Sequence, residues 1–130
     1  MAIRVVRLGQ PRAQDEGVRL GTVRRPPRGV KKTDFAKKDW YDVWLPDLAP
    51  SEQLRSWALS DDWTDERWNR YRKSYLREMK EAGPSRLINL LAALSADSNF
   101  SVGCYCEDES RCHRSLLREL LSDAGAALVD

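Results

Sequence analysis

The sequence predicts an α/β fold, and two observations support this prediction. Near the C-terminus, a strand pattern at 99–105 is followed by an amphipathic helix pattern and by a second strand pattern at 127–129. A strand, a helix and a parallel strand in this order form a βαβ unit. The opening residues 3–8 are rich in β-branched side chains and end at a glycine and a proline, which indicates a further strand. We therefore expect a single domain over residues 1–130, with a mainly parallel sheet flanked by helices and a C-terminal βαβ unit.

Between these ends, the first part of the chain predicts a second strand and a long loop. At 18–22, apolar and β-branched residues alternate with other residues, which is the period of a half-buried strand. Pro26 and Pro27 then exclude a helix, so we expect this arginine-rich segment to be an extended loop. An apolar run at 40–45 stops at Pro46. The chain before Pro46 therefore supplies strands and loops rather than helices.

Three helices are predicted in the middle of the chain. A short helix begins after Ser51, whose hydroxyl is suited to cap it. A longer helix runs from about 63 to 82 and ends at Gly83-Pro84, and another helix runs from 84 or 85 to about 95. The apolar face of the longer helix is expected to be buried, and it consists of Trp68, Tyr71, Tyr75, Leu76 and Met79.

Composition excludes several classes of protein. The 130 residues are 42% hydrophobic and include five Trp, four Tyr and two Phe, which can build a core, so wholesale disorder is excluded. No window holds the roughly 18 consecutive apolar residues of a membrane span, so we expect no membrane partner. Arg4 and Arg7 interrupt the apolar run at the start, which therefore lacks the pattern of a secretory signal. We expect a cytoplasmic protein of unknown oligomeric state.

Positive charge is concentrated in the N-terminal part of the chain. The formal net charge is only +2, but residues 1–38 contain 11 Lys or Arg and 3 acidic residues, whereas residues 39–130 contain 11 and 17. Such a basic segment can contact phosphates of a nucleic acid, or it can be a solvated face that pairs with the acidic part of the same chain. Both alternatives stay open. The densest basic cluster consists of Arg24, Arg25, Arg28, Lys31 and Lys32.

The three cysteines lie close together in the sequence. Cys104, Cys106 and Cys112 fall within nine residues, and no other cysteine is present. An odd number of clustered cysteines does not fit a secreted disulfide framework, so we interpret them as thiols in a reducing compartment.

The residues around these cysteines form the candidate site. In an open α/β sheet, ligands bind beyond the carboxyl ends of the strands, where the next helix begins. Free backbone N–H groups at that helix start attract an anion, which Arg114 can hold through two hydrogen bonds. The same field favours the thiolate of Cys112, and the imidazole of His113 can act as a general acid or base. We expect both His113 and Arg114 to face open solvent at the tip of the sheet.

Two other interpretations of this segment compete. Three thiols and one imidazole are an acceptable zinc ligand set, namely Cys104, Cys106, Cys112 and His113. The spacing disfavours zinc, because it lacks the CxxC motifs typical of structural zinc sites. We therefore expect no cofactor. In the other interpretation the cysteines pack as small apolar residues, which we favour for Cys104.

Four motifs between Ile3 and Val129 indicate a family. They are Pro27-Arg28-Gly29-Val30; Trp44-Leu45-Pro46-Asp47-Leu48-Ala49-Pro50-Ser51 with Leu54, Arg55 and Trp57; Trp68, Tyr71, Tyr75 and Glu78; and Cys104-Tyr105-Cys106 followed by Cys112-His113-Arg114. In these motifs the chain resembles the bacterial family catalogued as domain of unknown function 488 (DUF488). It departs from the family at Arg25-Pro26, where a Leu-Trp is usual, and at Val23, where an Asp is frequent. The resemblance supports the fold and implies no specific chemistry, because the family has no established activity.

Together these observations lead to two functional hypotheses. In the first, the protein is an enzyme-like member of this family that acts on a nucleotide or nucleic-acid substrate, with His113 as proton donor or acceptor and Cys112 as an auxiliary thiol. In the second, it is a non-catalytic module that binds nucleic acid or a protein partner through residues 24–32. The expected substrate-binding residues are Arg114, Arg28, Arg24 and Cys106. Tyr71, Tyr75 and Trp44 are candidates for the pocket wall and equally for the core.

Overall fold

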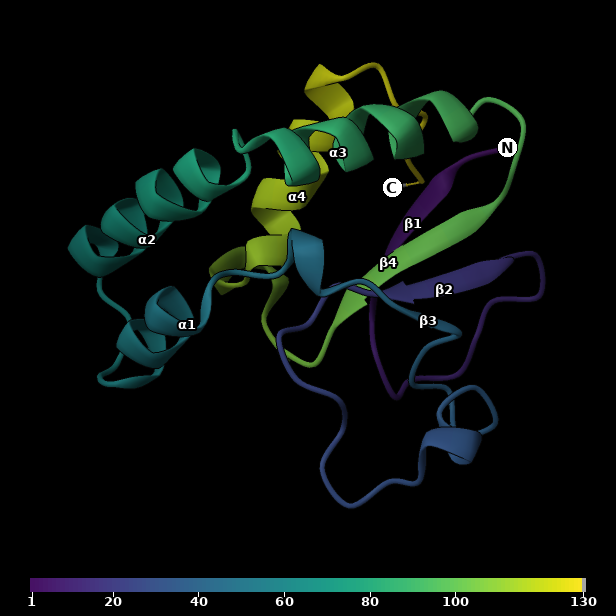
Figure 1. The fold of residues 1–130 in the computed structure, drawn as a ribbon, viewed down its shortest axis with the longest axis horizontal. Coiled ribbons are helices and arrows are strands. Elements are labelled where there is room, and N and C mark those ends of the chain that lie inside the picture. Colours follow the sequence, from purple (N-terminus) through teal and green to yellow (C-terminus); the bar gives the residue numbers. More distant parts are fainter. Residues whose placement is uncertain (130) are drawn as a thin grey trace.

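A four-stranded, all-parallel sheet forms the centre of the structure, a computed structural model that describes residues 1–129 (Figure 1). The strand order is β1-β4-β2-β3, with β4 paired to both β1 and β2. The predicted α/β class and the parallel sheet are therefore confirmed. The strands are β1 (Ile3–Arg7), β2 (Val18–Gly21), β3 (Val43–Trp44) and β4 (Phe100–Cys104).

The C-terminal βαβ unit is present, but its last strand is minimal. After β4 and the helix that follows it, the chain returns beside β1, where Leu128 forms one parallel bridge with Ile3. Two hydrogen bonds hold it there: the Ile3 N–H donates to the Ala127 carbonyl and the Val129 N–H donates to the Ile3 carbonyl, each at 2.9 Å. The strand predicted at 127–129 is thus a single bridge at the edge of the sheet.

Four helices accompany the sheet, and two of them begin where a hydroxyl cap was available. Ser51 Oγ accepts a hydrogen bond from the Leu54 N–H, and Thr64 Oγ1 accepts one from the Arg67 N–H, so each satisfies an amide of the first turn. The helices are α1 (Glu52–Leu59), α2 (Asp65–Glu78), α3 (Ala82–Leu94) and α4 (His113–Asp123). None of the helices within residues 1–129 is long and apolar enough to cross a membrane.

One predicted helix boundary is wrong. Gly83 and Pro84 were expected to end the long helix, but α2 already ends at Glu78, and both residues lie in the first turn of α3. Proline is accepted there because the first N–H groups of a helix have no partner within the helix. The two helices consequently meet at a short connection, visible in Figure 1 as the step between α2 and α3.

All four helices contribute side chains to one hydrophobic core that also includes one face of the sheet. This face carries Ile3 of β1 and Val102 of β4, both fully buried, and the predicted stripe of α2 packs here through Tyr71 and Tyr75. In Figure 1 the helices lie together on one side, and the long loops lie on the other. The helices therefore lie on one side of the sheet. The same core includes Leu54 of α1, Ile88 and Leu91 of α3, and Leu116, Leu117 and Leu121 of α4.

The opposite face of the sheet holds a buried ion pair. Side chains alternate along a strand, so Ser101 and its neighbour Arg19 on β2 point away from Val102. The Arg19 guanidinium donates to both carboxylate oxygens of Glu16, at 2.7 and 3.0 Å, and the two side chains are 1% and 2% exposed. Ser101 Oγ donates to the same carboxylate at 2.7 Å. This network fastens the loop before β2 to the centre of the sheet.

Two buried tyrosines provide a test of the fold. The Tyr75 hydroxyl donates to the Leu48 carbonyl at 2.7 Å, whereas the Tyr41 hydroxyl has no hydrogen-bond partner within the described residues. Tyr75→Phe is expected to lower the free energy of unfolding by about 1–3 kcal/mol, because it leaves a buried carbonyl unsatisfied. Tyr41→Phe, the matched control, should leave it unchanged or raise it. Urea denaturation measures both, and equal losses for the two variants would contradict this account.

Candidate functional site

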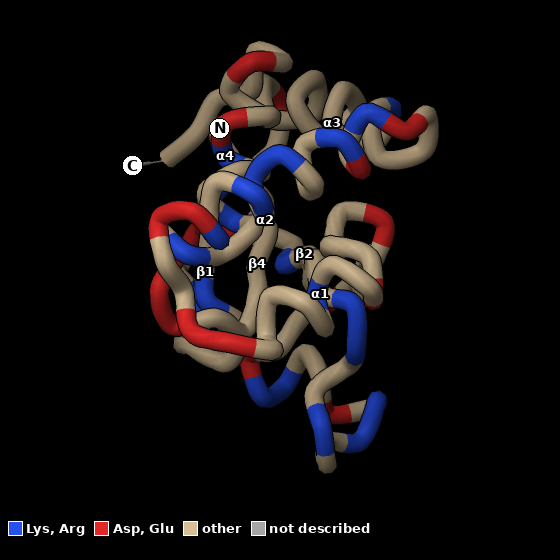
Figure 2. The backbone as a smooth tube through the Cα atoms, turned by 90° about the vertical axis from the view of Figure 1, so that its left-hand side faces the viewer, with Lys and Arg blue, Asp and Glu red and all other residues tan. Residues whose placement is uncertain are grey.

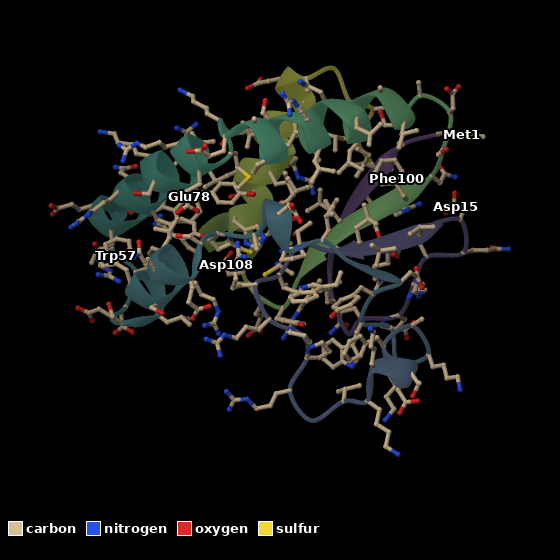
Figure 3. All side chains as sticks on the ribbon, viewed as in Figure 1. Met1, Asp15, Trp57, Glu78, Phe100 and Asp108 are labelled. Carbon is tan, nitrogen blue, oxygen red and sulfur yellow. The ribbon has the colours of Figure 1, made fainter. Side chains whose placement is uncertain are left out.

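The candidate site lies at the carboxyl end of the sheet, where the sequence placed it. β4 ends at Cys104, and the chain then passes through an exposed loop that contains Asp108 (labelled in Figure 3) before α4 begins at His113. Cys112 is the N-cap residue of α4, and its Sγ accepts a hydrogen bond from the Arg114 N–H at 3.5 Å. The helix start therefore presents a sulfur atom where a hydroxyl or carboxylate is more usual.

The three cysteine sulfurs converge at this point. The Sγ atoms of Cys104, Cys106 and Cys112 all lie within 4.8 Å of one another, and Cys104 Sγ is 3.7 Å from Cys106 Sγ. Cys104 and Cys112 are buried and Cys106 is exposed, and all three are free thiols. Cys104 also packs against Leu8 and Val23, as expected for a small apolar residue. The fold therefore brings together residues that are up to eight positions apart in the sequence.

The pKa values of the three thiols are shifted in different directions. Hydrogen bonds from Cys104 and Cys106, together with His113, lower the pKa of Cys112 well below the ordinary range of a thiol, although burial opposes this. Hydrogen bonding to the other two cysteines and burial raise the pKa of Cys104. The hydrogen bond from Cys104 lowers the pKa of Cys106. The hydrogen bond to Cys112 and burial together outweigh this effect and raise the pKa to about 11. Of the three thiols, Cys112 is therefore the one that these interactions favour as a thiolate.

His113 lies beside Cys112 but not at an open surface. Its Nε2 is 2.7 Å from the Thr22 carbonyl oxygen, which can only accept, so Nε2 carries a proton and Nδ1 faces Cys112 Sγ at 3.8 Å. The side chain is 3% exposed, because Tyr75 of α2 packs on its ring at a centroid distance of 5.5 Å. The expectation that this imidazole faces open solvent is corrected. Its role in proton transfer stays a prediction.

Arg114 also points inward. It is 3% exposed, and its Nη2 donates to the Cys106 carbonyl at 2.6 Å. Its Nε has no hydrogen-bond partner within residues 1–129, and the residue does not line the cavity described below. The expected position at an open tip is therefore corrected for Arg114 as well. In this arrangement Arg114 holds the loop that carries Cys106.

A cavity of about 320 Å³ opens above the three sulfurs, which form part of its lining together with His113. Its cationic side chains come from three segments: Arg24 and Arg25 from the loop after β2, Arg55 from α1 and Arg111 from the turn before α4. No carboxylate belongs to the lining within the described residues. The cavity is therefore suited to an anion. Its apolar wall includes Val23, Pro50, Leu59, Trp63 and Tyr71.

The arginines of the cavity are not equally available. Arg24 is committed to the chain, since it donates to the carbonyls of Pro46, Ala49 and Pro50 at 3.0–3.3 Å. Arg25 pairs with Glu52 at 2.9 Å, whereas Arg55 contacts the same carboxylate only at 3.4 Å. Among these, Arg55 has the weakest contacts and the greatest freedom to meet a ligand.

The basic loop forms a second depression beside this cavity. Figure 2 shows Lys and Arg gathered in the lower loop, below the sheet and helices. The second depression, of about 550 Å³, contains Arg28 of the predicted set and shares Arg25, Arg55 and Tyr105 with the cavity. Trp44, a predicted wall residue, lines neither of them; its indole N–H donates to the Val23 carbonyl at 2.8 Å.

The structure adds residues that the sequence analysis did not single out as site residues. Arg55, Arg111 and Trp63 line the cavity, although they lie on α1, before α4 and before α2 respectively. Only the family resemblance pointed to Arg55. Trp63 carried no signal, because its approach to the cysteines depends on how the chain before α2 packs against the end of the sheet. Arg111 is the sequence neighbour of Cys112, but the sequence does not show that its side chain lines the cavity.

Comparison with known proteins finds relatives of unknown function. The family described as "Active DUF488-N3 subclade" matches residues 3–125. The uncharacterized protein YeaO of Escherichia coli is 35% identical over 81 residues, which cover 62% of this chain and 64% of YeaO, just under two thirds. The uncharacterized protein Rv3073c of Mycobacterium tuberculosis is 27% identical over 120 residues, or 92% of this chain and 93% of that protein. No solved structure gives a significant match.

Proposed function

The chain belongs to the DUF488 family, in its active N3 subclade, and from this premise we propose that it is an enzyme that acts on an anionic, nucleotide-like substrate through Cys112. One observation supports the proposal above all others. The cavity brings the sulfur of Cys112, four arginines and an aromatic wall together in a space of about 320 Å³. A phosphate can meet the arginines while an apolar ring system packs against Trp63 and Tyr71.

The proposed chemistry is nucleophilic. The Cys112 thiolate forms a bond to an electrophilic atom of the substrate, and the leaving group departs with the electron pair of the bond that breaks. His113 Nδ1 faces the sulfur and can accept the thiol proton, while the Thr22 carbonyl fixes the ring through Nε2. A nucleophile, a base and a group that orients the base are the components of this type of catalysis. The free thiols also support the proposal that the protein works in the cytoplasm.

A second candidate function rests on the depression around the basic loop. Arg7 and Arg28 lie there with Trp40 and Tyr105, next to the arginines that it shares with the cavity. Cations that meet phosphates, combined with aromatic side chains that stack on bases, are typical of single-stranded nucleic-acid binding. In this function the protein is a binding module rather than an enzyme. Its affinity for an oligonucleotide would depend steeply on salt and on Arg28, but not on Cys112.

Ligand binding provides the test of the proposed function. Adenosine 5′-monophosphate is expected to bind more tightly than either adenosine or inorganic phosphate, because only the nucleotide uses both the arginines and the aromatic wall. Arg55→Gln should weaken nucleotide binding by about 10- to 100-fold, the value of one hydrogen bond to a charged group. Isothermal titration calorimetry measures each affinity.

The control is Arg86→Gln, an exposed arginine on α3 that lines neither depression. It should bind the nucleotide as the wild type does. Equal affinity for adenosine and its monophosphate, or an Arg55→Gln variant that binds normally, would refute the anion pocket. An oligonucleotide that binds through Arg28 without any nucleotide binding in the cavity would favour the binding module.

A further inference from the structure

We propose that Cys104, Cys106 and Cys112 form a binding site for a thiophilic divalent metal ion of the zinc type. The three sulfurs come from Cys104 at the end of β4, Cys106 in the loop that follows and Cys112 at the N-cap of α4. Soft thiolate ligands select ions such as Zn²⁺ over Mg²⁺ or Ca²⁺, which prefer oxygen. The binding step itself does not rest on the proposed function.

The spacing of the sulfurs fits such an ion. In a tetrahedral site with Zn–S bonds of about 2.3 Å, neighbouring sulfurs are about 3.8 Å apart. Cys104 Sγ and Cys106 Sγ are 3.7 Å apart, and all three sulfurs lie within 4.8 Å of one another. Small side-chain rotations therefore suffice to close the site. The sequence spacing disfavoured zinc, but the fold supplies the convergence that spacing alone does not show.

The surroundings of the sulfurs also resemble those of a metal site. Metal ligands are held in place by hydrogen bonds from outer groups. Here the Arg114 N–H donates to Cys112 Sγ at 3.5 Å, and the Arg114 guanidinium fixes the Cys106 carbonyl at 2.6 Å. The start of α4 adds a partial positive charge that favours thiolates. Arg114 is thus a positioning residue for two of the three ligands.

The fourth coordination position points to a ligand from the cavity. All three cysteines line the cavity, so water or a cavity-bound ligand can reach an ion held by them. Three protein ligands with an open position are typical of zinc sites that exchange a ligand. An ion bound there takes the lone pair of Cys112, so it competes with nucleophilic attack by the same sulfur. This last consequence, inhibition by the ion, rests on the proposed function.

Titration of the reduced protein with Co²⁺, a spectroscopic probe for such sites, tests the proposal. We expect one equivalent to bind and to produce the ultraviolet charge-transfer absorption of cobalt–thiolate bonds. Zn²⁺ should then displace Co²⁺ and abolish this absorption. Binding should also release thiol protons, and this release is measurable by calorimetry in buffers of different ionisation enthalpy.

Two variants distinguish the loss of a metal ligand from a general loss of folding. Cys106→Ser alters an exposed residue and should weaken Co²⁺ binding by more than about 100-fold, since even outer-group changes cost 10- to 100-fold. Ser110→Ala, in the loop between the ligands, should bind as the wild type does, because its hydroxyl contacts only Asp108. Circular dichroism checks that each variant is folded. Absence of the charge-transfer absorption, or normal binding by Cys106→Ser, would overturn the metal site. Nucleotide binding through Arg55 is measured independently of either result.

Discussion

Glu16→Gln is expected to lower the free energy of unfolding by about 3–5 kcal/mol, the cost of leaving one member of a buried ion pair without its partner. Glu16 and Arg19 are 2% and 1% exposed, and the carboxylate accepts two hydrogen bonds from the guanidinium. The glutamine amide would direct an N–H group at the donors of Arg19. The pair lies on the sheet face opposite the helices and away from the candidate site. We therefore expect Glu16→Gln to lower the stability of the fold without changing the site directly. Urea denaturation measures it.

A surface pair and the pH dependence provide the controls. Glu119→Gln breaks the exposed pair with Arg72 and should cost less than about 1 kcal/mol. Burial acts to raise the pKa of Glu16. The hydrogen bonds from Arg19, Ser101 and the Ala13 amide outweigh this effect, and the net result is a pKa lowered from 4.5 to about 2. The contribution of Glu16 is therefore complete above its unfolded pKa of 4.5 and is lost as the pH falls toward 2. A Glu16→Gln variant that unfolds like the wild type at pH 7 would show that the pair is not buried.

Cys112 is expected to react with iodoacetamide at a rate that hardly changes between pH 6 and 8, whereas the rate for Cys106 rises by about tenfold per pH unit. The attacking species is the thiolate, which displaces iodide. The pKa of Cys112 is far below this range because of hydrogen bonds from Cys104 and Cys106 and the interaction with the adjacent His113 ring, while the pKa of Cys106 is raised to about 11. Peptide mass spectrometry, with a chelator present, measures the two rates in one experiment.

Cys112→Ala is the matched variant for this measurement. It removes the sulfur that raises the pKa of Cys106, so Cys106 should react faster at neutral pH than in the wild type. The arginines of the cavity do not bias the result, because iodoacetamide is uncharged. A Cys112 rate that rises steeply with pH would mean that its thiol is protonated, and the nucleophilic part of the proposed function would then be wrong.

The proposed enzyme and the proposed metal site use the same sulfurs in different ways. As a nucleophile, Cys112 needs its lone pair free, with the neutral thiols of Cys104 and Cys106 as hydrogen-bond donors. As a metal ligand, it shares that lone pair with the ion, and the other two cysteines lose their protons. Comparing the alkylation of Cys112 with and without Zn²⁺ therefore reports which form of the cluster is present.

Much of the fold was accessible from the sequence because its signals are local. The β-branched run at 3–8, the cap Ser51 and the aromatic stripe of α2 each depend on a few neighbouring residues. The boundary at Gly83-Pro84 was misplaced because proline suits both the region after one helix and the first turn of the next. The local sequence therefore does not distinguish a proline that follows one helix from a proline in the first turn of the next helix.

The sequence by itself determined the α/β class, a strand at 99–105, a helix that begins near Arg111 or Cys112, and hence the end of the sheet where the site lies. It also placed the cysteines, His113 and the basic loop near that end. Only the tertiary structure decided that the three sulfurs meet, that His113 and Arg114 are buried, and that Arg55 completes the cavity. The physical reason is packing: α1 and α2 fold over the sheet end, and Tyr75 closes on His113 at 5.5 Å, through contacts between residues far apart in the chain. Contacts between residues far apart in the chain do not produce a local sequence pattern from which they could be predicted.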